Sequence, residues 1–111
     1  HNQKHPDGRN PVTSAASCYA VYAPAKDVTK APGEWNQGRL VVDGKQVEHW
    51  LNGEKVVAYE IDGDDWKAKI AASKFKDMPH FAKRDKGPIA LQDHGDRVAY
   101  RSIKLKALAG K

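Results

Sequence analysis

Two turn signals constrain the fold of this 111-residue chain more than any other feature. Asp43-Gly44 and Asn52-Gly53 are both dipeptides favoured in two-residue β-hairpin turns, and alternating apolar residues flank each of them. The stretch from residue 34 to residue 62 therefore predicts three antiparallel strands. These strands set the expected architecture, because the rest of the chain carries weaker signals.

The two turns also predict which side chains share a face of the sheet. If both dipeptides form the turn centres, Val42 pairs with Lys45 and Leu51 pairs with Glu54. Strand alternation then places on one, mainly apolar, face Leu40, Val42, Val47, His49, Leu51, Val56 and Ala58. The opposite, polar face is expected to hold Gln37, Arg39, Gln46, Glu48, Trp50, Lys55 and Tyr59, with Arg39 directly across from Glu48.

Further elements are predicted on both sides of this meander. Residues 17–23 form a short apolar run typical of a strand, and residues 64–75 begin with acids and carry apolar residues at helical spacing. Residues 87–94 and 97–108 are expected to be two more strands, joined by a tight turn at Gly95-Asp96. Six strands and one short helix predict an all-β fold, an antiparallel β-sandwich.

One domain is expected, spanning residues 1–111, because the chain is too short for two. Six short strands, one of them isolated, hardly fill two sheets, and each sheet must cover its apolar face. We therefore expect an incomplete sandwich. Upstream sequence, another chain or self-association would complete it.

Composition argues against several classes of partner. The net charge is +5, but lysines and arginines alternate with acids along the chain, which disfavours nucleic-acid binding. Cys18 is the single cysteine, so no disulfide forms within the chain, and no Cys/His spacing resembles a zinc site.

There is no apolar run of membrane-spanning length and no signal peptide, and the chain begins with His1. We expect a processed product whose true N-terminus lies upstream.

Polar residues gather at the end of the apolar run 87–91. With a two-residue turn at Gly95-Asp96, His94 and Gln92 share one face of the predicted hairpin with Arg101. An imidazole, an amide and a guanidinium then converge over two alanines, an arrangement suited to a flat polar ligand such as a sugar. An ordinary solvent-facing sheet surface is the alternative interpretation.

Several segments together resemble a known family. "GEWNQGRLVVDGKQVEHWLNGEKVV" and "GPIALQDHGDRVAYRSIKLKAL" resemble the C-terminal part of the 3-keto-disaccharide hydrolase family, formerly a domain of unknown function, and "KHPDG" and "SCYAVYAP" are similar to the segments before them. The resemblance implies a concanavalin-like jelly roll with a sugar site on its concave sheet, in periplasmic or secreted bacterial proteins. Family members are longer at the N-terminus, and they commonly have asparagine where this chain has Ser102.

The resemblance also implies an activity, the cleavage of 3-keto-glycosides by proton abstraction at C2 followed by elimination and hydration. His94 is the expected base or metal ligand, and Arg101 would hold the enolate, a role that a divalent metal ion could also fill. The remaining expected contacts to substrate are Gln92 for hydroxyl groups, Trp50 and Tyr59 for ring stacking, and His5 and Asp7 in a loop over the site.

Each of these residues also has a purely structural interpretation. His94 could close a turn, Arg101 could pair with Asp93 or Asp96, and Trp50 could pack against other parts of the fold. His49 on the apolar face is expected to be a hydrogen-bonded core histidine. At the level of the whole protein, the alternatives to an enzyme are a non-catalytic carbohydrate-binding module and a structural subunit of a larger assembly.

Overall fold

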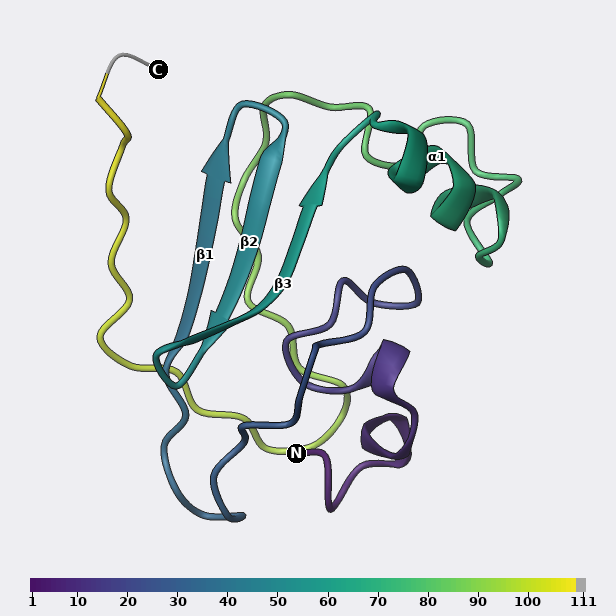
Figure 1. Ribbon diagram of the computed structural model, residues 1–111. Helices are drawn as coiled ribbons and strands as arrows, with labels where there is room; N and C mark the ends of the chain where they lie inside the picture. The colour runs from purple at the N-terminus through teal and green to yellow at the C-terminus, as the bar shows by residue number, and fades with distance from the viewer. Residues whose placement is uncertain (110–111) are drawn as a thin grey trace.

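The computed structural model describes residues 1–109 and contains one antiparallel sheet and one α-helix (Figure 1). The elements in order are two 3-10 turns, η1 (Pro6–Arg9) and η2 (Pro11–Thr13), then β1 (Gly38–Asp43), β2 (Gln46–Leu51), β3 (Glu54–Glu60) and α1 (Asp64–Ala71). The strand order is β1-β2-β3. The predicted three-stranded meander and the short helix after it are confirmed.

The turn between β2 and β3 is the predicted one. Asn52 and Gly53 have positive φ angles of 51° and 83°, as a two-residue turn of the Asn-Gly type requires, and Leu51 pairs with Glu54. The Asn52 side chain strengthens this corner, since its Oδ1 accepts from the Gln37 N–H at 2.9 Å.

The turn between β1 and β2 lies one residue later than predicted. Gly44 has a φ of 59°, whereas Asp43 still belongs to β1 and pairs with Gln46. A glycine at the first central position with positive φ is typical of a type II′ turn, in which only that position needs the left-handed region. The loop is therefore Gly44-Lys45, and the predicted pairing of Val42 with Lys45 is wrong.

This shift changes the cross-strand neighbours but not the faces. Val42 pairs with Val47, and Arg39 pairs with Trp50 instead of Glu48. The predicted cross-strand pair of Arg39 and Glu48 is therefore wrong. The Arg39 guanidinium lies 5.6 Å from the centre of the Trp50 ring instead.

A β-bulge reverses the faces predicted for the end of β3. The register of β2 against β3 shifts between His49 and Trp50, so that His49 pairs with Val57 and Val47 pairs with Tyr59. One extra residue in a strand inverts the alternation of every side chain beyond it. Tyr59 therefore lies on the apolar face with His49, and the prediction that it shares the polar face with Trp50 is wrong.

The core lies on one face of the sheet, over β2 and β3. The buried apolar side chains are Val21, Val47, Leu51, Val56, Val57 and Trp66. Three rings hold the other segments to the sheet: Tyr59 lies 5.1 Å from Tyr22 and 5.3 Å from Trp66, each measured between centroids and nearly parallel. The helix and the loop before the sheet are thus anchored to β3.

Over β1 the same apolar face is open. Leu40 is 64% exposed and Val42 is 52% exposed, although both point to the side of the buried Val47. The chain as a whole exposes 8884 Å², compared with about 6,100 Å² for a compact monomer of its mass. The expected shortage of cover for the sheet is therefore present in this structure.

The strand predicted over residues 17–23 is wrong. This segment reverses direction through a tight turn, with Ala20 at a φ of 62° and a single bridge between Cys18 and Tyr22. The Cys18 N–H donates to the Tyr22 carbonyl at 3.0 Å, and the Tyr22 N–H donates to the Cys18 carbonyl at 2.9 Å. Local bonds across the turn replace the ladder that a strand would need.

The predicted C-terminal hairpin is also wrong. No strand occurs in residues 87–108, and the two halves of this stretch diverge after the corner at Gly95, the second half running alone beyond β1 (Figure 1). The predicted pairs across Gly95-Asp96 are therefore not formed. Ile89 and Leu105 are 74% and 83% exposed, so neither half has an apolar surface beneath it. An isolated two-stranded ribbon is marginally stable, which accounts for the missing ladder.

A sandwich needs a second sheet, and residues 1–109 contain one sheet. The coarser prediction, an antiparallel β structure with one short helix, is confirmed. The jelly roll itself stays a prediction.

Removing the Trp66 side chain tests whether the ring contacts anchor the helix. Trp66 is 6% exposed, so Trp66→Ala should lower the free energy of unfolding by about 3–5 kcal/mol, the range for truncating a buried aromatic residue. Urea denaturation followed by circular dichroism measures this loss. Trp66→Phe should retain part of the stability, which keeps the test informative if the alanine variant does not fold. Trp35→Ala is the control, because Trp35 is 45% exposed; equal losses at both positions would contradict the assignment.

Candidate functional site

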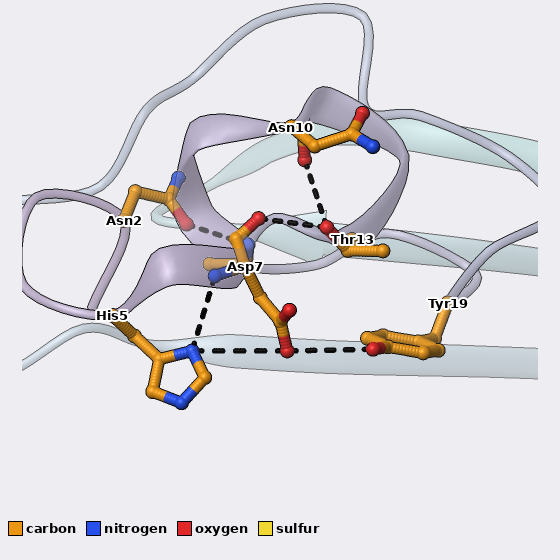
Figure 2. A network of polar contacts seen from close by, with 7 residues as sticks. Asn2, His5, Asp7, Asn10, Thr13 and Tyr19 are labelled. Carbon is orange, nitrogen blue, oxygen red and sulfur yellow. Dashed lines mark hydrogen bonds and ion pairs between the residues drawn. The ribbon is translucent and has the colours of Figure 1, made fainter.

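The sequence "KHPDG" folds into the start of η1 and presents His5 at its N-cap. Pro6 occupies the first helical position, where its fixed φ and missing N–H cost nothing. His5 Nδ1 accepts the Asp7 backbone N–H at 3.2 Å (Figure 2). Gly8 is required here, because a Cβ at that position would clash with the backbone of Asn2. The imidazole is thus held by its own turn.

Asp7 is the centre of a small polar network in this loop (Figure 2). Its carbonyl accepts from Thr13 Oγ1 at 2.8 Å, and its carboxylate accepts from the Tyr19 hydroxyl at 3.4 Å. The charge of Asp7 raises the pKa of Tyr19, so this phenol stays protonated and keeps donating. The same carboxylate lies 3.7 Å from His5 Nδ1.

These contacts determine which ring nitrogen of His5 carries the proton in the neutral form. In neutral imidazole one ring nitrogen donates and the other accepts. Nδ1 accepts from Asp7, so the neutral form carries its proton on Nε2. His5 therefore offers an Nε2–H donor, and protonation at Nδ1 would exchange the backbone bond for the ion pair with the Asp7 carboxylate.

His94 meets His5 at this loop. The two imidazole centroids are 5.2 Å apart and the rings are almost perpendicular, at 87°. Neither ring nitrogen of His94 makes a hydrogen bond among residues 1–109, so the lone pair of the neutral ring is free to accept a proton. His5, Asp7 and His94, all predicted as site residues, are thus brought together from opposite ends of the chain.

Arg101 contacts a residue outside this cluster. Its guanidinium lies 4.0 Å above the centre of the Trp35 ring, a cation–π contact, and the predicted grouping of Arg101, Gln92 and His94 on one sheet face is wrong because the hairpin is absent. The predicted alternative of an ion pair with Asp93 or Asp96 is not found in the described residues either.

Gln92 contributes its backbone to the corner, accepting the Tyr100 hydroxyl at 2.6 Å on its carbonyl oxygen. Asp93 uses its carboxylate to accept the Gly95 N–H at 3.1 Å. These two bonds hold the corner that presents His94, and the second accounts for the carboxylate of Asp93 in the polar run.

Trp50 lies on the outer face of the sheet between two cations. Arg39 and Lys55 lie 5.6 and 5.9 Å from the ring centre, and the indole Nε1–H donates to Glu48 at 2.8 Å. This hydrogen bond, together with Lys55, lowers the pKa of Glu48 and keeps it ionised. The indole is thereby fixed in orientation while half-buried.

Behind the sheet, His49 is a core histidine, as predicted. Its Nδ1 lies 2.8 Å from the Ala16 carbonyl oxygen and must donate to it, so Nε2 accepts the Tyr59 hydroxyl at 3.2 Å. Burial, and then Cys18 beside it, raises the pKa of Tyr59. Tyr59 is therefore a neutral part of the inner cluster and is not presented to a ligand beside Trp50.

Residues 1–109 contain neither a metal-binding cluster nor a membrane-spanning helix. No group of three or more His, Cys, Asp or Glu side chains is arranged to hold a metal ion, so His5, Asp7 and His94 are not such a group. No helix in the same residues has the length and apolar character to cross a membrane.

The comparisons with known proteins identify the family of this chain. Residues 1–106 match the model of the 3-keto-alpha-glucoside-1,2-lyase-like domain, and the chain belongs to that family. A curated relative from Bacteroides thetaiotaomicron, named 3-keto-disaccharide hydrolase, is 32% identical over 120 aligned positions. A crystal structure from Parabacteroides distasonis, named as a candidate glycosyl hydrolase, is similar with a TM-score of 0.53 and 36% identity.

These relatives are longer than the present chain. The alignment covers 96% of this chain and 41% of the Bacteroides protein. The structural match covers 57% of this chain and 29% of the Parabacteroides one. The family resemblance expected from the sequence segments is therefore confirmed, together with the broad class of carbohydrate hydrolases among its relatives.

Sequence reasoning missed two features. The Arg101 guanidinium lies over Trp35, a contact between segments far apart in the sequence that no local pattern predicts. Phe75 ends the segment predicted as helical and Phe81 lies in the loop after it, yet both stack in the group of rings around Trp66. Such contacts depend on loop geometry, which no periodic pattern encodes.

The burial of Cys18 leads to a testable prediction about the reactivity of its thiol. Burial raises the pKa of this thiol more than its contact with Tyr59 lowers it, so less thiolate is present at a given pH. Because thiolate is the reactive form, the pH at which iodoacetamide labelling reaches half its maximal rate should lie higher in the native chain than in urea. Mass spectrometry measures the label. Identical pH profiles in the two states would contradict the burial of this thiol.

Proposed function

We propose that this chain is part of a carbohydrate-active hydrolase or lyase that cleaves 3-keto-glycosides. The match of residues 1–106 to the 3-keto-alpha-glucoside-1,2-lyase-like domain supports the substrate class. The contact between His94 and His5, with Asp7 beside them, is the observation that carries the proposal for this chain, because it assembles acid–base groups at one place. The proposed complete fold is a concanavalin-like jelly roll, and the proposed location is the periplasm or the exterior of the cell.

The proposed chemistry follows from the ketone of the substrate. A carbonyl at C3 acidifies the proton on C2, and the glycosidic oxygen on C1 is β to that carbonyl. A base takes the C2 proton, and the electrons form an enolate at O3. As the enolate collapses, a C1–C2 double bond forms and the C1–O bond breaks, while the departing oxygen takes a proton. Water then adds at C1, which completes a net hydrolysis.

In this proposal His94 is the base and His5 is a hydrogen-bond donor. The ring nitrogens of His94, which make no hydrogen bond within residues 1–109, are available to accept a proton. His5 offers Nε2–H because its Nδ1 is occupied by the Asp7 N–H, so it can donate to O3 or to the leaving oxygen. Asp7 acts through His5 by holding that orientation, which makes it a positioning residue.

Arg101 and Gln92 flank His94 on the same segment. We propose that they hold the enolate oxygen and the sugar hydroxyls, which requires them to approach His94 when substrate binds. Trp35, against which the Arg101 guanidinium lies, would then offer a ring beside the substrate. Tyr59 is left out of the proposal, because its ring packs against Tyr22 and Trp66.

A non-catalytic carbohydrate-binding module is the second candidate, and Trp50 favours it. An indole fixed by Glu48 and bracketed by Arg39 and Lys55 can stack on a sugar ring without any base. The two candidates differ in whether His94 is needed for turnover. Completion of the open face over Leu40 by further sequence, another chain or self-association is proposed for both.

Substituting His94 tests the catalytic role. In the full-length gene product, His94→Ala should lower kcat for release of nitrophenol from p-nitrophenyl 3-keto-glucoside by about 10²–10⁴-fold, the usual contribution of a general base. Substrate binding, measured by calorimetry, should change little. His80→Ala is the control, since His80 is exposed and lies outside the cluster. Turnover undiminished in His94→Ala would remove this residue from the mechanism, and binding without any turnover in the unmodified protein would favour the binding module.

Substituting Trp50 tests the stacking role. Trp50→Ala should weaken binding of a 3-keto-glucoside about fivefold, the order expected for one lost aromatic contact. His80→Ala is the control, because His80 is exposed and lies outside the sheet. Calorimetric titration measures the affinity of both variants for the sugar. An unchanged affinity in Trp50→Ala would exclude Trp50 from the sugar site.

A further inference from the structure

A hollow lies beside α1, in a part of the chain that the proposed function does not use. The chain folds back next to the helix after Ala71 (Figure 1). The hollow has a volume of about 250 Å³. Its apolar lining comes from the helix and from the segment that follows it: Trp66, Ile70, Ala71, Phe75, Met78, Pro79 and Phe81.

Aromatic rings form a fixed wall of this hollow. The Phe75 and Phe81 centroids are 4.0 Å apart with the rings nearly parallel, at 7°. Phe81 in turn lies 6.3 Å from Trp66, again nearly parallel. Because Trp66 is buried and held by Tyr22 and Tyr59, the wall is anchored to the core. A flat apolar group can therefore bind without ordering these side chains first.

The charged groups at this hollow are mostly cations. Lys67, Lys76 and Lys83 line it together with one acid, Asp62. Asp62 is already engaged by Lys83 at 3.2 Å and by Lys45 at 3.3 Å, and these lysines lower its pKa. Lys67 and Lys76 form no ion pair within residues 1–109. The hollow thus combines an apolar wall with uncompensated positive charge, which favours an anion.

Size and chemistry restrict the ligand further. An apolar cavity of about 150 Å³ suffices for benzene, whereas pockets for drug-sized ligands measure about 300–1,000 Å³. A volume of about 250 Å³ therefore suits one ring with a small charged substituent. A sugar fits less well, because the lining contains no asparagine, glutamine, serine or threonine side chain to form hydrogen bonds with its hydroxyl groups.

We propose that this hollow binds a small aromatic carboxylate of the benzoate class. The ring packs against the wall made by Phe75 and Phe81, and the carboxylate points to Lys67 and Lys76. The proposal is independent of the proposed glycoside cleavage, because none of these residues belongs to the cluster of His5, Asp7 and His94. Failure of one leaves the other standing.

Titration with sodium benzoate, followed by nuclear magnetic resonance of the tryptophan indole N–H signals, tests the proposal. Trp66 is one of three tryptophans, and Trp66→Phe assigns its signal. Benzoate should shift the Trp66 signal in a saturable way, more than the signals of Trp35 and Trp50. The double variant Lys67→Gln/Lys76→Gln should bind benzoate about fivefold more weakly, the order expected for two exposed ion pairs.

Two controls separate this site from general affinity for aromatic rings or for anions. Benzyl alcohol has the ring without the charge and should bind more weakly than benzoate, and acetate has the charge without the ring and should not shift Trp66. Lys69→Gln is the matched variant, because Lys69 is on the same helix but does not line the hollow. Equal affinity for benzoate and benzyl alcohol, an equal loss in Lys69→Gln, or no saturable shift of Trp66 would overturn the proposal.

Discussion

The contact of Trp66 with Tyr22 and Tyr59 is the interaction on which the rest of the structure depends. A three-stranded sheet with one apolar face cannot be stable in water unless something covers that face. Here a helix and an irregular loop provide the cover, and both reach the sheet through these rings. The loop that carries Tyr22 also follows η1 and η2, so the anchoring of the sheet helps to fix the turns that present His5 and Asp7.

The β-bulge beside His49 decides which residues take part in this contact. Without it Tyr59 would lie on the outer face, and Trp66 would have no ring on β3 to meet. Both Val56 and Val57 are buried at the bulge, which an uninterrupted strand of alternating faces does not allow. The sequence signal for this feature is the pair of adjacent valines, and it competes with the stronger alternation of the neighbouring residues, so the bulge was not predictable from periodicity alone.

Local chemistry was predictable and long-range contact was not. Asn52-Gly53 specifies its turn by itself, and Asp64 and Asp65 mark the start of α1, so these features follow from a few neighbouring residues. Gly44 is compatible with two turns, Asp43-Gly44 and Gly44-Lys45. The two turn types differ in which central residues need a positive φ, and the pattern of apolar residues does not reveal this. The meeting of His5 with His94 depends on how two loops pack; the family resemblance, and no spacing in the sequence, led us to expect the loop of His5 over the site. The C-terminal hairpin failed for a related reason, because alternation predicts a strand only where a surface exists to receive its apolar face.

His5 and His94 make different hydrogen bonds. This difference would give them different roles in the proposed acid–base chemistry, with His94 as the base and His5 as the hydrogen-bond donor. His5 is bound at Nδ1 by the backbone of its own turn, which fixes one tautomer and leaves a donor at Nε2. His94 projects from a corner held by bonds to Gln92 and Asp93, none of which uses its ring. A base needs a lone pair that no other group occupies, and a donor must keep its proton in place. In the proposed mechanism both conditions would be met before substrate binds, since the corner is held by Asp93 and Tyr100 without the His94 ring, and the turn uses only Nδ1 of His5.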